Sequence, residues 1–158
     1  MFRRHRTSDS CRPLTDAEHA LARGMFGDAI DLHRVRLRRR KWWIFQPRHI
    51  TMAPRGHIHF HPESTAWRAC FASAGIGLQA HLIHELVHVW QHQHGKSLIL
   101  HRHPFCRYDY DIRPGWTFDR YDVEQQAEIV RHVFLLRRGV VVPHAPPLAV
   151  LEALLPFS

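Results

Sequence analysis

Two segments of the chain place apolar residues at helical spacing and carry the signals that begin and end a helix. The first follows a capping box formed by Thr15 and Glu18, and a helix is predicted over 15–26. The second follows Asp122 as its N-cap and is predicted to run to Arg138, before a glycine. We therefore expect one helix over 15–26 and another that begins after Asp122 and runs to Arg138.

The segment between these helices begins with β patterning. Apolar and basic residues alternate over 32–38, which predicts a strand with its arginines facing outward. A basic, aromatic loop follows over 38–43. Residues 49–52 and 57–61 are predicted to pair as a hairpin, because the Pro and Gly at 54–56 are typical of a turn.

Apolar residues return to a period of 3.6 over 77–94, which predicts a helix with two different faces. One face is apolar and suits a core. The other face carries imidazoles and one carboxylate within an arc of about 100°; these residues are His81, His84, Glu85, His88 and His92.

Three residues of this helix form an HExxH motif, His84, Glu85 and His88. Histidines four residues apart lie one above the other on a helix, so both rings can reach one Zn²⁺. Glu85 points about 100° aside and is expected at the zinc-bound water, as a general base. An exposed helix with histidines on its solvent face would give the same letters.

A catalytic zinc site needs a third protein ligand. His94 stands where metzincins carry theirs, but Gln91 replaces the glycine that lets that helix turn, and all three methionines precede the motif. This arrangement is rejected. Glu124 and Glu128 instead share one face of the next predicted helix, so one can bind metal while the other orients a ligating histidine. Carboxylates that favour the helix dipole are the alternative interpretation.

These motifs resemble a known family. The helix HELVHVWQH and the following EQQAE are similar to gluzincin-type zinc metallopeptidases, and the chain over 14–139 is similar to the metallopeptidase core domain of extracellular contractile injection systems and to bacterial Vgr-related proteins. Further matching stretches are FGDAID at 26–31 and GHIHFHP at 56–62. The resemblance implies that His84, His88 and Glu124 bind zinc, Glu85 is the base, and Glu128 supports a ligand. Glu128 stands where the family often has Asp, so the two glutamates remain interchangeable.

The resemblance also implies a strand that pairs with an extended substrate at the edge of the cleft. Alternation places His57, His59 and His61 on one face of that strand, although solvated polar residues of an edge strand would look the same. Tyr108 and Tyr110, together with His101 and His103, are candidates for an oxyanion donor. Packing of the tyrosines in the core is the alternative.

The predicted fold class is α+β: a single zincin-like domain with a small antiparallel or mixed sheet, an active-site helix and a following ligand-bearing helix. Three regions are expected. Residues 1–13 form a basic flexible N-terminus, 14–139 the domain, and 140–158 a Pro-rich tail with a short apolar helix over 148–155.

The composition and charge of the chain limit the classes of partner that we expect. The chain has 158 residues, 16 histidines and a net charge of +8, and twelve basic against five acidic residues lie in 1–48. Basic and aromatic residues interleave over 34–43, but no recognised motif supports nucleic acid as a partner. Three cysteines without a CxxC pair argue against a disulfide framework. No signal peptide or membrane span is visible, which predicts a cytoplasmic protein, or export by a signal-peptide-independent apparatus.

Two functions are expected from the sequence. The first is a zinc-dependent metallopeptidase acting on a peptide or protein substrate, with Zn²⁺ as its cofactor. The alternative is an adaptor or scaffold, non-catalytic or processing, of a contractile-injection or type VI (Vgr/Rhs-associated) secretion system, with a secretion-system or toxin protein as partner.

Overall fold

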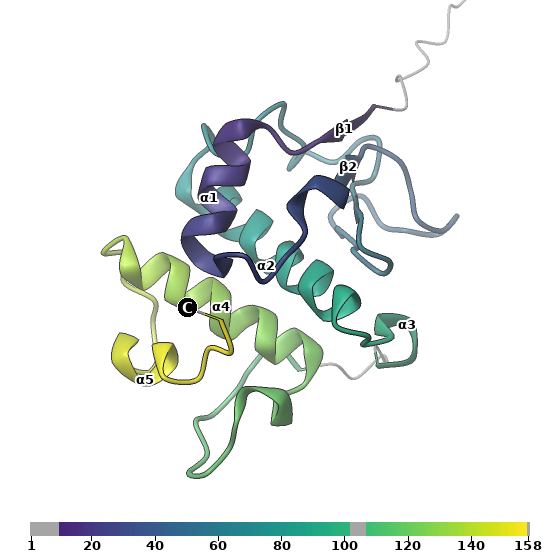
Figure 1. The fold of residues 1–158 in the computed structure, drawn as a ribbon. Coiled ribbons are helices and arrows are strands. Elements are labelled where there is room, and N and C mark those ends of the chain that lie inside the picture. The colour runs from purple at the N-terminus through teal and green to yellow at the C-terminus, as the bar shows by residue number, and fades with distance from the viewer. Residues whose placement is uncertain (1–9, 102–106, 158) are drawn as a thin grey trace, which may run out of the picture.

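The computed structural model describes residues 10–101 and 107–157 of the chain. It has an α+β fold in which one small sheet lies beside a group of helices (Figure 1). The sheet order is β1 (Cys11–Pro13), β2 (Arg36–Arg38), β3 (Ile58–His59). β1 runs antiparallel to β2, and β2 runs parallel to β3. The predicted fold class, including the mixed sheet, is confirmed.

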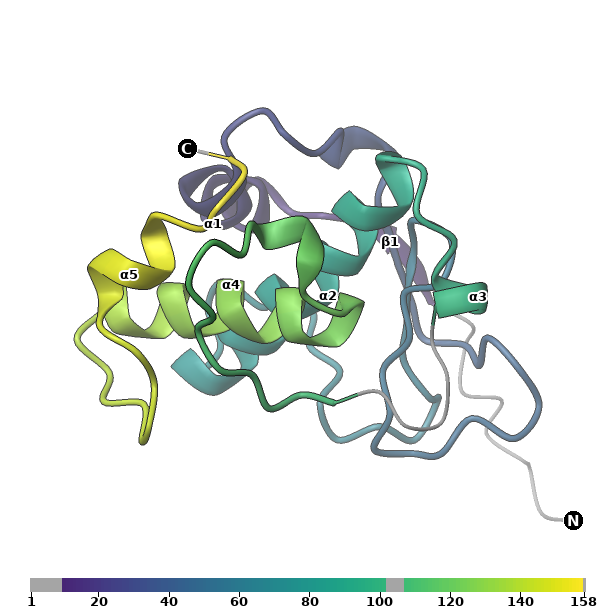
Figure 2. The ribbon, with the colours of Figure 1, turned by 90° about the horizontal axis from the view of Figure 1, so that it is seen from below.

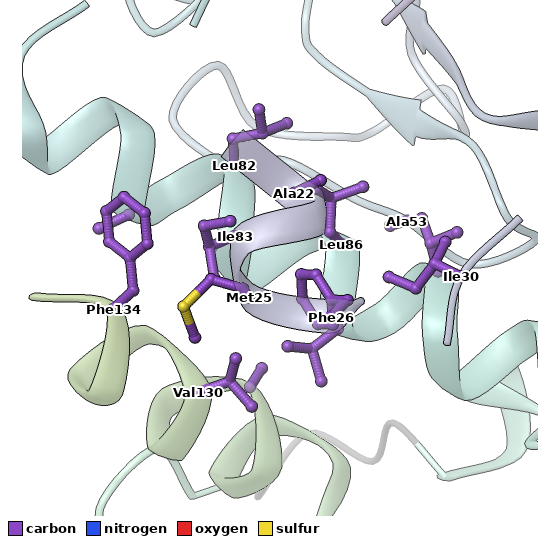
Figure 3. Close-up of a cluster of buried hydrophobic side chains, with 14 of the residues drawn as sticks. Ala22, Met25, Phe26, Ile30, Ala53, Leu82, Ile83, Leu86, Val130 and Phe134 are labelled. Carbon is purple, nitrogen blue, oxygen red and sulfur yellow. The ribbon is translucent and has the colours of Figure 1, made fainter. Parts of the chain in front are cut away.

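Three helices surround the core, α1 (Asp16–Phe26), α2 (Ile76–Gln93) and α4 (Val123–Arg137). α2 and α4 lie side by side along most of their length (Figure 2). Figure 3 shows α1 contributing Met25 and Phe26 to the space between these two helices. The remaining helical segments are short: two 3₁₀ turns at Leu32–Arg34 and Phe118–Arg120, α3 (Leu98–His101) and α5 (Leu148–Glu152).

The predicted capping box of α1 is present and extends into a larger network. Thr15 accepts a hydrogen bond from the Glu18 amide, and the Glu18 carboxylate accepts one from the Thr15 amide. The same carboxylate accepts two bonds from Arg12, at 2.7 and 2.9 Å, and one from the Phe71 amide. Burial raises the pKa of Glu18, but these hydrogen bonds outweigh it and lower the pKa. One carboxylate thus joins β1, α1 and the segment before α2.

The β region differs from its prediction in two places. Leu32–Arg34 is a 3₁₀ turn and only Arg36–Arg38 is a strand, because Leu32 and Val35 are both buried at a spacing of three. The predicted hairpin is reduced to one antiparallel bridge, in which Met52 and His59 exchange backbone hydrogen bonds of 3.0 and 2.7 Å. β3 is held on its other side by β2, so it lies between β2 and the bridged segment at Met52.

The chain ends also differ from expectation. Residues 11–13, predicted in the flexible N-terminus, form β1, because Arg12 is bound to buried Glu18. α5 ends at Glu152, earlier than predicted. Cys11 and Cys70 are free thiols, and Cys106 lies outside the described residues. None of the helices in the described part of the chain is long and apolar enough to cross a bilayer.

Candidate metal centre

The two long helices bring the three predicted ligands together. His84 and His88 project from one face of α2 towards α4, where Glu124 lies in the first turn. All three residues are buried, with exposures of 8%, 4% and 0%. The imidazole face of α2 is therefore covered by α4 at this point, and the interpretation of His84 and His88 as solvent-facing residues is wrong.

Three ligand atoms form a nearly equilateral triangle. The Nε2 atoms of His84 and His88 are 3.3 Å apart, and Oε2 of Glu124 lies 3.3 Å from the first and 3.2 Å from the second. A tetrahedral zinc with bonds of about 2.0–2.1 Å needs ligand atoms about 3.3–3.4 Å apart. The group could therefore hold a metal ion, and its spacing suits zinc.

Hydrogen bonds on the far side of each ring fix which nitrogen faces the triangle. Nδ1 of His84 donates to Oε1 of Glu128 at 2.8 Å, because a carboxylate can only accept. Nδ1 of His88 donates to Oε1 of Gln91 at 2.9 Å. When both rings are neutral, each Nε2 atom carries a lone pair that faces the Glu124 carboxylate. Three electron-pair donors converge on one buried point, an arrangement that a cation stabilises.

The orientation of Gln91 is itself determined. Its side chain is fully buried, and its amide nitrogen donates to the carbonyl of Val123 and to Oε1 of Gln126, each at 2.9 Å. Gln126 in turn donates to backbone carbonyls in the turn before α4. The amide oxygen of Gln91 must therefore face His88. Neither Gln91 nor Gln126 is predicted from the sequence to have a role at the site; the available signal was that polar residues lie at buried helix positions beside the motif.

The carboxylates make the site strongly negative. Burial lowers the pKa of His84, but Glu124, Glu128 and Glu85 outweigh it and raise the pKa to about 9. Burial raises the pKa of Glu128, but its bond to His84 is the largest opposing effect and the pKa is lowered. Both shifts favour a positive charge at the position of the His84 ring.

Glu85 lies beside the triangle without being part of it. Its Oε2 is buried, and no described residue donates a hydrogen bond to it. The residue lines a hollow of about 410 Å³ together with His84, Tyr108 and Arg131. A carboxylate oxygen that keeps its lone pairs next to a cleft is suited to accept a proton from a molecule in that cleft.

A second hollow, of about 260 Å³, opens on the other side of the triangle. His88 and Glu124 form its inner wall, and the rest is apolar: Trp42, Trp43, Met52, Ala53, Pro54, Leu98, Ile99 and Val123. The segment 49–54 contributes to both hollows, with residues 49–51 at the first and 52–54 at the second. This segment therefore lies across the mouth of the site.

The three histidines predicted to line the cleft lie elsewhere. Of the described residues that line the two hollows, none is His57, His59 or His61. His59 is buried against the ring of Trp42, and Nδ1 of His61 accepts the Glu63 amide. His57 borders a separate hollow at the C-terminal end of α2. β2 pairs with β3, so the segment 49–54 borders the two hollows instead of these three histidines.

The remaining candidate residues lie at different distances from the site. The Tyr108 ring stacks on His84 with centroids 6.3 Å apart and borders the hollow of Glu85. The Tyr110 hydroxyl lies 2.6 Å from Nδ1 of His132, outside both hollows. His94 follows the last residue of α2 and bonds the Trp90 carbonyl, away from the triangle. His103 lies outside the described residues.

The chain is an α+β domain in which two packed helices supply two histidines and a glutamate to one buried point. These features place it in the class of candidate metal-binding proteins. No family model matches the chain. The chain is 39% identical over 136 residues to the type VI secretion system spike protein VgrG2b of Pseudomonas aeruginosa, an alignment that covers 81% of this chain and 13% of that protein. The solved effector domain of VgrG2b is 35% identical, with a TM-score of 0.73 over 90% of this chain and 80% of that structure.

The chain therefore belongs to the family of the VgrG2b effector domain. It corresponds to only a small part of the curated relative, 13% of its length.

Proposed function

We propose that the protein is a zinc-dependent hydrolase of peptide bonds. The observation that carries the proposal is the convergence of two imidazole nitrogens and a buried carboxylate oxygen within 3.3 Å of one another. Two nitrogens and one oxygen at this spacing are a donor set that suits zinc, and three protein ligands leave a position for a reacting molecule. His84, His88 and Glu124 would hold the ion.

When bound, zinc supplies Lewis-acid polarisation of a carbonyl and lowers the pKa of a water ligand. Glu85 supplies the base: its buried Oε2 takes a proton from the attacking water and returns it to the leaving nitrogen. Glu128 and Gln91 hold the two imidazoles in the tautomers described above. Tyr108, in the same hollow as Glu85, is the candidate donor to the carbonyl oxygen of the substrate.

The substrate would lie along the segment 49–54. Met52 turns its backbone groups towards His59, so the backbone groups of Thr51 and Ala53 point away from β3, on the side where an extended peptide would pair by strand addition. A peptide in this position spans both hollows. The apolar hollow favours a large apolar side chain next to the cleaved bond.

The relationship to VgrG2b supports a second level of function. We propose that the protein acts as an effector that a type VI secretion system exports, with a spike or toxin protein of that system as its partner. Family membership favours this proposal independently of any catalysis. A pull-down with a type VI spike protein from the same organism should retain the partner; failure to retain it would contradict this part of the proposal.

Zinc content and cleavage of an apolar-rich protein substrate test the enzyme. The wild type should bind one equivalent of zinc and cut the substrate. Glu85→Gln should keep the zinc and lose cleavage, while His84→Ala should lose both. His94→Ala, a change in an exposed histidine at the end of the same helix, is the matched control and should retain both. Unchanged cleavage by Glu85→Gln would refute the role of Glu85.

A further inference from the structure

A loop beside the candidate metal centre exposes three consecutive apolar side chains. Trp43, Ile44 and Phe45 have exposures of 49%, 74% and 72%. They lie in the connection between β2 and β3, which extends away from the helices (Figure 1). Isolated exposed apolar residues are ordinary, but a contiguous group at a loop tip marks a surface that contacts something else.

The loop is held in this conformation by a buried amide. Gln46 is 2% exposed; its oxygen accepts the Trp42 amide at 2.7 Å, and its nitrogen donates to the carbonyls of Ile50 and His59. The backbone N–H of Gln46 also donates to the Trp43 carbonyl and closes the turn. The three apolar side chains are therefore presented by an ordered turn. Binding to a partner then avoids the free-energy cost of ordering this turn.

Positive charge surrounds this tip. The chain has eight basic and no acidic residues between positions 32 and 62. Arg40 and Lys41 precede the tip and Arg48 follows it, all exposed; Arg48 pairs with Glu63 at 2.7 Å. An apolar tip within a basic collar is complementary to an anionic lipid surface, where cations contact phosphates and the tip enters the boundary of headgroups and acyl chains.

The ring geometry distinguishes this surface from one for single-stranded nucleic acid, which needs separate aromatic faces for stacking. The Trp43 and Phe45 rings pack edge to face, 5.4 Å apart, and Ile44, the most exposed of the three, has no ring. The Trp42 ring is covered by the Arg55 guanidinium at 5.2 Å. We propose that the turn at Trp43, Ile44 and Phe45 docks the protein on the surface of anionic phospholipid bilayers.

This contact is peripheral and independent of the proposed hydrolase. It does have a spatial consequence for that site. Trp43 belongs both to the tip and to the wall of the apolar hollow that His88 and Glu124 close on the inside. A protein docked through the tip holds the mouth of this hollow next to the lipid surface, where membrane-associated polypeptides are concentrated.

Co-sedimentation with vesicles tests the proposal on the full chain. The wild type should sediment with vesicles of phosphatidylglycerol and phosphatidylcholine, and much less with phosphatidylcholine alone. Ile44→Ser with Phe45→Ser should weaken partitioning by about tenfold or more. Val141→Ser is the matched control, because Val141 is 85% exposed but lies far along the chain, after α4; it should sediment as the wild type does.

A charge variant separates the two contributions. Arg40→Gln with Lys41→Gln should reduce binding to the anionic vesicles, and added salt should have the same effect on the wild type. Thermal unfolding verifies that each variant is folded. Wild-type protein that stays in the supernatant with anionic vesicles overturns the proposal, as does a tip variant that sediments unchanged. Binding to oligothymidine in the absence of vesicle binding would favour nucleic acid instead and also overturn it.

Discussion

Replacing Gln91 by leucine should weaken zinc binding without removing a ligand. The change keeps the size of the side chain roughly constant but deletes the acceptor of the His88 Nδ1 proton. His88 can then adopt the other tautomer, with its proton inside the triangle of ligand atoms. Loss of such a hydrogen bond to a ligating histidine lowers metal affinity by about 10-fold to 100-fold.

The same change should also destabilise the fold. Gln91 is fully buried, and its removal leaves the His88 Nδ1–H group without an acceptor and the Val123 carbonyl with one hydrogen bond fewer. An unsatisfied buried group costs about 1–3 kcal/mol and a lost hydrogen bond about 0.5–1.5 kcal/mol, so we expect a loss of about 1.5–4.5 kcal/mol. The second acceptor of the Gln91 amide, Oε1 of Gln126, keeps a bond from Lys96 at 3.2 Å and adds little.

Two further variants separate ligand orientation from folding. Gln91→Glu restores an acceptor for His88 but not the amide donors, so it should be destabilised yet bind zinc at least as tightly as the wild type. Gln93→Leu removes a glutamine on the same helix that bonds only the backbone of Asp31 in an exposed position, and should change neither property greatly. Zinc competition titration and urea unfolding measure the two effects. Wild-type zinc affinity in Gln91→Leu would refute the orientation argument.

Three other predictions concern the scaffold and are measured by urea unfolding. Glu18→Ala should cost about 3–5 kcal/mol because it breaks a buried ion pair, whereas Glu152→Ala, at a half-exposed pair, should cost less than about 1 kcal/mol. The folded pKa of Glu18 lies below its ordinary value of 4.5, so this stabilisation is present above that pH and is lost as the pH falls through the folded pKa; the gap between wild type and Glu18→Ala should narrow in acid. Gly56→Ala should cost about 1–2 kcal/mol, since φ is +77° and the new Cβ would lie 3.0 Å from His92, while Gly77→Ala in the open first turn of α2 should stabilise by about 0.5–1 kcal/mol. Equal effects at each matched pair would contradict these arguments.

The helices were predictable because their signals are local. Capping residues and a 3.6-residue period fix where α1 and α4 begin, and each predicted start lies within one residue of the observed one. The strands depend on neighbours that are distant in sequence. Alternation alone could not tell that β2 would pair with β3, nor that Trp42 would pack against His59, so the sequence did not reveal that 49–54 borders the two hollows.

The residues of the candidate site could be predicted from the sequence only in part, for a similar reason. The spacing of His84 and His88 predicts that both rings share one face of a helix, but Glu124 and Glu128 also share one face. Only the axial offset between α2 and α4 places Glu124 among the ligand atoms and Glu128 on the far side of His84. The supporting role of Gln91 depends on the same offset, because its partner carbonyl belongs to α4.

The packing of α2 against α4 has an evolutionary consequence. Every atom of the triangle, and each side chain that orients it, lies within 84–91 or 123–128, two helical stretches joined by more than thirty residues. Insertions and deletions in that connection leave the distance between the helices untouched when they fall before the Phe118 and Tyr121 carbonyls that hold Gln126. Descendants of this domain can therefore exchange the connecting segment, and with it the outer wall of the cleft, while inheriting an unchanged donor set. Length variation among relatives should accordingly concentrate between the two stretches and be excluded from within them.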